Sequence, residues 1–437
     1  MIGLALLAAL AAQPGDEPQT GPPASAATDA AEAERLLGEM LLERFECARC
    51  HQLERQSVVQ DRSCVDCHRA IVSGALPAPP ELLSRWRGNL KNLLEVPSLR
   101  GAGGVLRAEW IEQYLLRPHE LRRGLAESMP RLSIKPTEAH AIAHALTGGK
   151  EPPSDVVRRG DAARGLALLE SKGCTTCHAY TGAGRALRTT APAGVEGEPL
   201  ARGIKLAPDL RATRERTTPA LVSALLDDPR LLRADALMPK IGLAEGEKAD
   251  LLAALFDLPV PLLPAKEPPP RLPVLTRKVR FAEVQGAVLQ KTCIHCHAED
   301  SRNLGVGGPG SSGGFGYAGT NLVLTSYARV LAGSQRAPTL DPELARSLDA
   351  PASLSEVFGP GVIPSRGPPG VHRSVFRPVE EGPMKGVPLL VAQLRARQLE
   401  EAGEVVPGVV GMPLGLPALS PGELQLVESW VAQGRPQ

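Results

Sequence analysis

The sequence is poor in aromatic residues and carries almost no net charge. Phe, Tyr and Trp together make up 3% of 437 residues. Aromatic side chains normally supply much of the bulk of a protein core, so we expect large planar cofactors to supply it here. The formal net charge of +1 gives no indication of a nucleic-acid partner.

Long apolar runs are also lacking beyond the N-terminus. Residues 1–12 are apolar and rich in small residues, with a cleavage-like triplet at 9–11, and are predicted to be a secretory signal peptide. They are too short to span a bilayer, and they lack a basic start, so the true start could lie upstream. A buried N-terminal helix is the alternative. We therefore predict a periplasmic or secreted protein without a transmembrane span, with a flexible linker at 13–30.

The eight cysteines all belong to Cys-x-x-Cys pairs, and each pair is followed at once by histidine. The four motifs contain Cys47, Cys50 and His51; Cys64, Cys67 and His68; Cys174, Cys177 and His178; and Cys293, Cys296 and His297. With 9 His in the chain, chance would place His after all four pairs with a probability on the order of 10⁻⁷. A thioredoxin-like redox pair needs no following histidine.

This pattern is compatible with two cofactors, zinc and haem. The first two pairs have nearly the spacing of a zinc ribbon, but zinc explains neither the four histidines nor the other two pairs. Cys-x-x-Cys-His is the attachment signature of c-type haem. Both cysteines bind the macrocycle and the histidine supplies one axial nitrogen to the iron. The motifs predict four covalently attached haems, which are normally attached outside the cytoplasm.

Methionine followed by proline and then by a helical pattern recurs three times. A methionine sulfur can occupy the second axial position of haem iron. The predicted ligands are Met129, Met238 and Met412. Met40 lies within a predicted helix and is more typical of a core. His372 and Met384 are rival ligands for the third domain, but only Met412 repeats the Met-Pro context.

The most complete unit spans residues 159–258, with a helix, one motif, a loop, Met238 and a second helix. The first domain, 31–149, repeats this order but carries two motifs. The predicted helix before the first motif makes His51 the equivalent of His178. The spacing to Met129 instead makes His68 the equivalent of His178. Loops change length more readily than packed helices, so we pair Met129 with His51.

The haem at His68 then needs another ligand. His119, His140 and His144 are the candidates. His140 and His144 lie four residues apart on one predicted helix face, which also fits an exposed surface. His119 lies in a loop before Met129, and we favour it. A five-coordinate haem is the alternative, and it would suit a peroxidase or a small-molecule reductase.

The third domain, 276–437, has a helix-like run before Cys293 and a long insertion between its motif and Met412. His295, between the two cysteines, is expected to be exposed and is given no role. A helix is predicted at 387–402. A capping box begins the last helix at Ser420, and Trp430 is expected to pack against the domain's first helix.

On these motifs the chain resembles class I c-type cytochrome modules. The resemblance implies a mainly α fold of three tandem haem-binding helical domains with long irregular loops. It also implies crossing first and last helices, and electron transfer between redox proteins. Iron with both axial positions filled has no vacant site for substrate, which favours electron carriage over catalysis. The extra motif and the enlarged third domain depart from the family's pattern, and residues 300–407 could instead form a docking surface.

Overall fold

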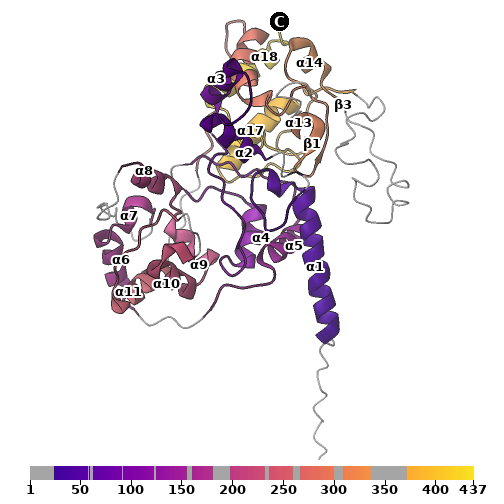
Figure 1. The fold of residues 1–437 in the computed structure, drawn as a ribbon. Helices are drawn as coiled ribbons and strands as arrows, with labels where there is room; N and C mark the ends of the chain where they lie inside the picture. The colour runs from indigo at the N-terminus through magenta and orange to yellow at the C-terminus, as the bar shows by residue number, and fades with distance from the viewer. Residues whose placement is uncertain are drawn as a thin grey trace, which may run out of the picture.

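The fold was analysed in a computed structural model and is mainly helical (Figure 1). The structure describes residues 24–57, 59, 63–90, 92–122, 125–154, 160–180, 197–231, 236–258, 266–299, 309–335 and 372–437. The predicted signal peptide lies outside these residues. In the described part, strands are limited to two short antiparallel pairs. None of the described helices is both long and apolar enough to cross a membrane.

The first helical group is built on the crossing of α1 and α5. Its elements are α1 (Ala24–Arg44), η1 (Cys47–Arg49), α2 (Cys64–Ser73), α3 (Pro80–Asn89), α4 (Ala108–Leu116) and α5 (Pro136–Thr147). Phe45, Ile111 and Ile142 are buried at its centre. α1 begins at Ala24, so the predicted linker at 13–30 is wrong over its last residues. Alanine is the strongest helix former, and this Ala-rich segment continues the helix toward the N-terminus.

The second helical group repeats this crossing with α6 and α11. Its elements are α6 (Ala162–Ser171), α7 (Cys174–Cys177), α8 (Gly197–Leu206), η3 (Leu210–Ala212), α9 (Thr213–Arg216), α10 (Pro219–Asp227), η4 (Pro229–Leu231) and α11 (Glu245–Phe256). Leu169, Leu251 and Leu255 are buried between its helices.

Glycine lets both pairs of helices touch backbone to backbone. Gly38 and Gly165 each lie nine residues before the first cysteine of a motif. A Cβ atom at Gly38 would lie 2.0 Å from the Ala141 carbonyl oxygen, and one at Gly165 would lie 2.0 Å from the Asp250 carbonyl oxygen. Any larger residue would have to push the helices apart. The repeat seen in the sequence therefore extends to the packing.

The third helical group packs its first and last helices around Trp430. Its elements are α12 (Phe281–Val284), η5 (Gln285–Cys293, a π-helix), α13 (Pro309–Ser312), β1 (Gly313–Gly314), β2 (Tyr317–Ala318), α14 (Tyr327–Ala332), β3 (Ser334–Gln335), β4 (His372–Arg373), α17 (Leu389–Glu401) and α18 (Pro421–Ala432). β1 pairs with β2, and β3 pairs with β4.

The predictions for the end of the chain are confirmed. The Phe281 and Trp430 ring centroids lie 5.7 Å apart, so Trp430 packs against the first helix. Ser420 Oγ accepts from the Glu423 amide at 3.3 Å, and Glu423 Oε2 accepts from the Ser420 amide at 3.0 Å. This reciprocal pair is the predicted capping box. The predicted helix at 387–402 is α17.

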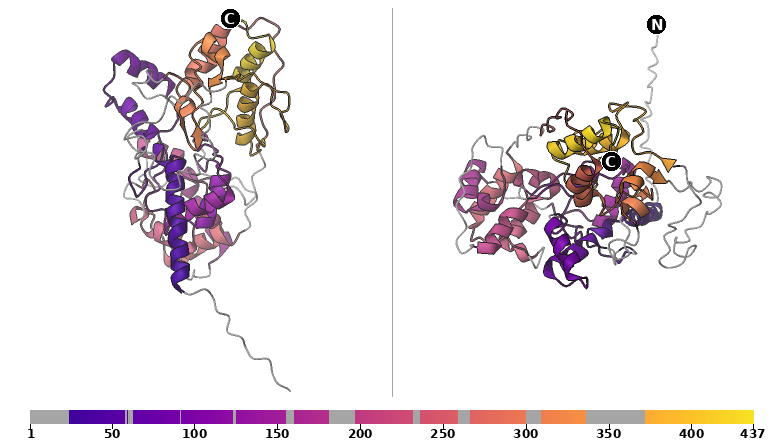
Figure 2. Two further views of the ribbon diagram at one scale, coloured as in Figure 1. Left: turned by 90° about the vertical axis from the view of Figure 1, so that its right-hand side faces the viewer. Right: turned by 90° about the horizontal axis from the view of Figure 1, so that it is seen from above.

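The first group contacts both of the others. The Asp209 amide donates to Leu121 O at 2.8 Å beside a bridge between Arg122 and Pro208. Toward the third group, the hydroxyls of Ser133 and Tyr317 lie 3.1 Å apart. α2 and α3 lie at the end of the molecule that holds the third group, away from the N-terminal part of α1 (Figures 1 and 2).

Candidate functional site

Two of the four motif histidines make the same backbone contact. His51 Nδ1 lies 2.8 Å from Pro97 O, and His178 Nδ1 lies 2.8 Å from Pro208 O. A carbonyl oxygen can only accept, so Nδ1 carries the proton and Nε2 keeps a lone pair for a metal. Burial lowers the pKa of both histidines, although the proline carbonyls act in the opposite sense. In this contact His51, and not His68, resembles His178.

Each of three apolar clusters contains the first cysteine of a motif and a Met-Pro methionine. Cys47 and Met129 pack against the cluster of the first group. Cys174 and Met238 do so in the second, and Cys293 and Met412 in the third. Met384 belongs instead to a separate cluster with Ala392 and Val406. The predicted methionines therefore lie in the same cores as their motifs, while ligation by them stays a prediction.

The eight cysteines are free thiols in this structure. Burial raises the pKa of Cys47, Cys293 and Cys296 to about 12. These three thiols are therefore almost fully protonated at neutral pH in the folded chain.

The histidines of the other two motifs lack the proline contact. The Nδ1 atoms of His68 and His297 are buried without a hydrogen-bond partner, and burial lowers the pKa of both rings. Gly310 lies against the His297 ring, where a Cβ atom would be 2.5 Å from Cε1. Both imidazoles are therefore held neutral by their surroundings.

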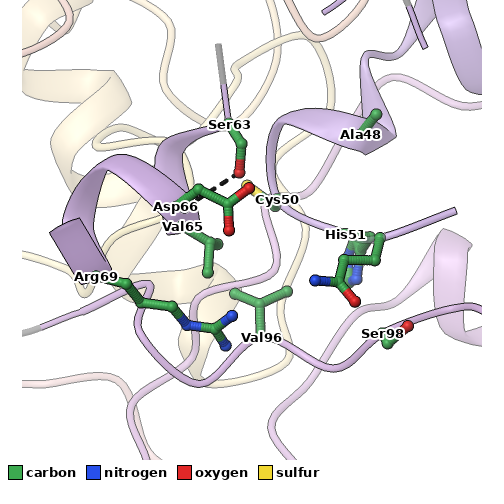
Figure 3. A pocket seen from close by; sticks show the side chains of 10 residues that line it. Ala48, Cys50, His51, Ser63, Val65, Asp66, Arg69, Val96 and Ser98 are labelled. Atoms are coloured by element: carbon green, nitrogen blue, oxygen red, sulfur yellow. Dashed lines mark hydrogen bonds between the residues drawn. The ribbon is translucent and has the colours of Figure 1, made fainter. Parts of the chain in front are cut away.

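The second motif begins a helix beside the first motif. Ser63 Oγ accepts from the Asp66 amide at 3.2 Å and caps α2. A pocket of about 170 Å³ separates η1 from α2, and side chains of both motifs line it (Figure 3). Its lining includes Cys50, His51 and Val65. The first two motifs therefore lie on two sides of one pocket.

Three contacts between motifs involve residues of α2. A hydrogen bond between the Cys50 and Cys64 thiols raises the pKa of Cys50 and lowers that of Cys64. Cys64 also lies close enough to Cys296 to raise its pKa further. The His68 and His295 ring centroids are 6.0 Å apart. The motif that begins at Cys64 starts 17 residues after Cys47, and the motif that begins at Cys293 starts 246 residues after Cys47. These three motifs thus meet around α2.

The candidate histidines downstream make other contacts. His119 is exposed, with Nδ1 3.1 Å from Arg117 O and its ring centroid 5.4 Å from that of Tyr114. His140 is exposed between Glu34 and Glu112, at 3.1 and 3.0 Å. His144 has a buried Nδ1 atom without a hydrogen-bond partner. Within the described residues, the contacts of His119 and His140 do not lead to His68.

Two half-buried arginines, Arg216 near His178 and Arg214 near Tyr180, are functional candidates that we did not single out from the sequence. The Arg216 guanidinium lies over the Trp110 ring at 5.2 Å, and its charge acts on His178. The Nε atoms of Arg214 and Arg216 are buried without a partner. Buried donors of this kind normally have an acceptor, so an anionic group would suit the site. The Arg-rich run 211–216, directly after the Pro208 segment, is the sequence signal that could have revealed them.

In the described part of the chain, no three His, Cys, Asp or Glu residues gather as metal ligands, although a zinc ribbon would require four.

Comparisons with protein-family models, with curated proteins and with solved structures found no match for this chain.

Proposed function

We propose that this chain is a periplasmic or secreted c-type cytochrome with four covalently attached haems, which carries single electrons between redox proteins. The observation that carries the proposal is the repeated pairing of a motif cysteine with a Met-Pro methionine in one apolar core. The proline contacts of His51 and His178, both at 2.8 Å, add to it.

The residues present fit covalently attached haem. Each cysteine pair would bind the macrocycle, and the histidine after it would supply one axial nitrogen. Met129, Met238 and Met412 would bind the iron through sulfur at the sites of His51, His178 and His297. When bound, c-type haem carries one electron by changing its iron between the ferric and ferrous states.

The chain's own residues would orient and tune these sites. The Pro97 and Pro208 carbonyls hold the Nδ1 protons, so Nε2 of His51 and His178 keeps a lone pair that would bind the iron. Arg214 and Arg216 have buried Nε donors that suit the haem carboxylates. Methionine raises the reduction potential above that of iron with two nitrogen ligands.

Electron transfer is favoured over catalysis because a protein side chain is available for both axial positions at three of the four sites. Such iron has no vacant position for a substrate. The expected partners are redox proteins that donate and accept single electrons.

A haem count tests the proposal directly. The full chain, exported and matured with c-type haem, should give four haems per chain in a pyridine haemochrome assay and a matching intact mass. Replacing Cys174 and Cys177 by alanine should lower the count to three. Met238→Ala, which leaves every attachment cysteine in place, should keep it at four. Two or fewer haems in the unaltered chain would overturn the proposal.

A further inference from the structure

His68 and His295 come from different motifs and lie close together. Their ring centroids are 6.0 Å apart and their planes are inclined by 47°. His68 belongs to α2 of the first group, whereas His295 lies between Cys293 and Cys296 of the third group. Cys64, one helical turn before His68, lies close to Cys296. Two pairs of side chains thus join these motifs.

The spacing of the two rings suits one metal between them. A metal–nitrogen bond is about 2.0 Å long in imidazole sites, and the nitrogen lies about 1.1 Å from the ring centre, so two imidazoles bound on opposite sides have centroids roughly 6 Å apart. Both ring planes then contain the metal–nitrogen axis, and rotation about this axis leaves their mutual inclination free. The observed distance of 6.0 Å therefore agrees with a shared ion.

We propose that His295 is the second axial ligand of the haem bound by Cys64, Cys67 and His68. The inference rests on the proposed function, and it replaces His119 in this role. The Met-Pro methionines lie in the cores of the other three motifs, so this haem has no methionine of its own. A histidine supplied by the third group completes the site.

His295 is exposed, as predicted, and its ring lies beside the ring of His68.

The arrangement makes one short segment serve two cofactors. Cys293 and Cys296 attach the haem of the third group, and His295 between them ligates the haem of α2. The relative position of these two haems is then set by one loop. This site belongs to neither helical group alone.

Axial ligation in the holoprotein tests the proposal. We expect near-infrared magnetic circular dichroism of the oxidised chain to show one bis-histidine haem and three histidine–methionine haems. In the reduced chain, no haem should bind CO. His295→Ala should retain four haems, lose the bis-histidine signal and bind one CO per chain. His119→Ala, the matched control, should behave as the unaltered chain.

Two further results complete the test. His295→Met should keep the iron six-coordinate and raise the lowest of the four reduction potentials. The proposal is overturned if the unaltered chain has no bis-histidine haem, a result that does not depend on any variant folding. It is also overturned if His119→Ala, rather than His295→Ala, opens the site, or if neither does. A haem count below four would instead contradict the proposed function.

Discussion

The first and second helical groups share one contact plan but differ in the loop between histidine and proline. Each has a glycine at its helix crossing and a histidine bound to a proline carbonyl. From His178 to Pro208 the chain advances by 30 residues, whereas from His51 to Pro97 it advances by 46. The longer loop contains the second motif, α2 and α3. The additional motif is thus a loop insertion that leaves the shared core intact.

This difference explains why the spacing between motif and methionine was a poor guide. His68 lies 61 residues before Met129, and His178 lies 60 residues before Met238. The agreement is a coincidence of loop length, because the proline contact belongs to His51. A packed helix and a backbone contact identify equivalent positions better than a count of residues does.

The largest expected effect comes from the helix crossings. Gly165→Ala should lower the stability of the second group by about 3 kcal/mol, because the new Cβ meets the backbone of α11. Gly38→Ala should do the same in the first group. The measurement is calorimetry of the full holoprotein, which separates thermal transitions of different parts.

Gly246→Ala is the matched control for these variants. It lies in the first turn of α11, and a Cβ atom there meets nothing within 4 Å. Alanine should be neutral or stabilise by about 0.5 kcal/mol, since it is the better helix former. If Gly38→Ala proves as harmless as this control, the two crossings are not equivalent.

A smaller effect, on reduction potential, should distinguish a methionine in the same core as a motif from a methionine outside these cores. On the proposed function, Met238→Ala should lower one of the four reduction potentials by on the order of a hundred millivolts, since axial ligands set haem potentials over a wide range. Potentiometry followed by absorption measures the change. Met384→Ala removes a buried methionine from a separate cluster. It should cost about 2 kcal/mol of stability and leave all four potentials unaltered; a shifted potential would make Met384 a ligand.

The smallest expected effect is a pH dependence of stability, which has opposite signs at the α1–α5 and α6–α11 crossings. Glu112 and Glu34 raise the pKa of His140 above 6.5. This pair stabilises fully below pH 6.5, and its contribution is lost as the pH rises through the raised pKa. The side chain of His140 is 60% exposed, so screening limits the gain to about 0.5 kcal/mol. Arg164 and the Asp161 amide instead lower the pKa of Asp250 below 3.8, so that contribution is lost in acid.

Melting temperatures at several pH values check both signs. His140→Gln should abolish the loss seen near and above neutrality in the first group, and Glu112→Gln should reduce it, because Glu34 still acts on His140. Asp250→Asn should flatten the acid dependence of the second group only. A common pH profile for both groups would contradict the assignment.

The helices and their caps could be predicted because their signals are local. The capping box at Ser420 needs only residues three apart, and the cores follow from helical periodicity. The start of α1 was missed because an Ala-rich stretch next to Pro and Thr looks like a linker. The contact of His68 with His295 was missed for another reason. Its residues lie 227 positions apart, and nothing in either motif encodes how the helical groups pack together.

The buried thiols bear on when a haem could be attached to them. Cysteine reacts as its thiolate, and with a pKa of about 12 only on the order of one thiol in 10⁵ is ionised at pH 7. On the proposed function, haem attachment is therefore expected before Cys47 and Cys296 are buried in their cores.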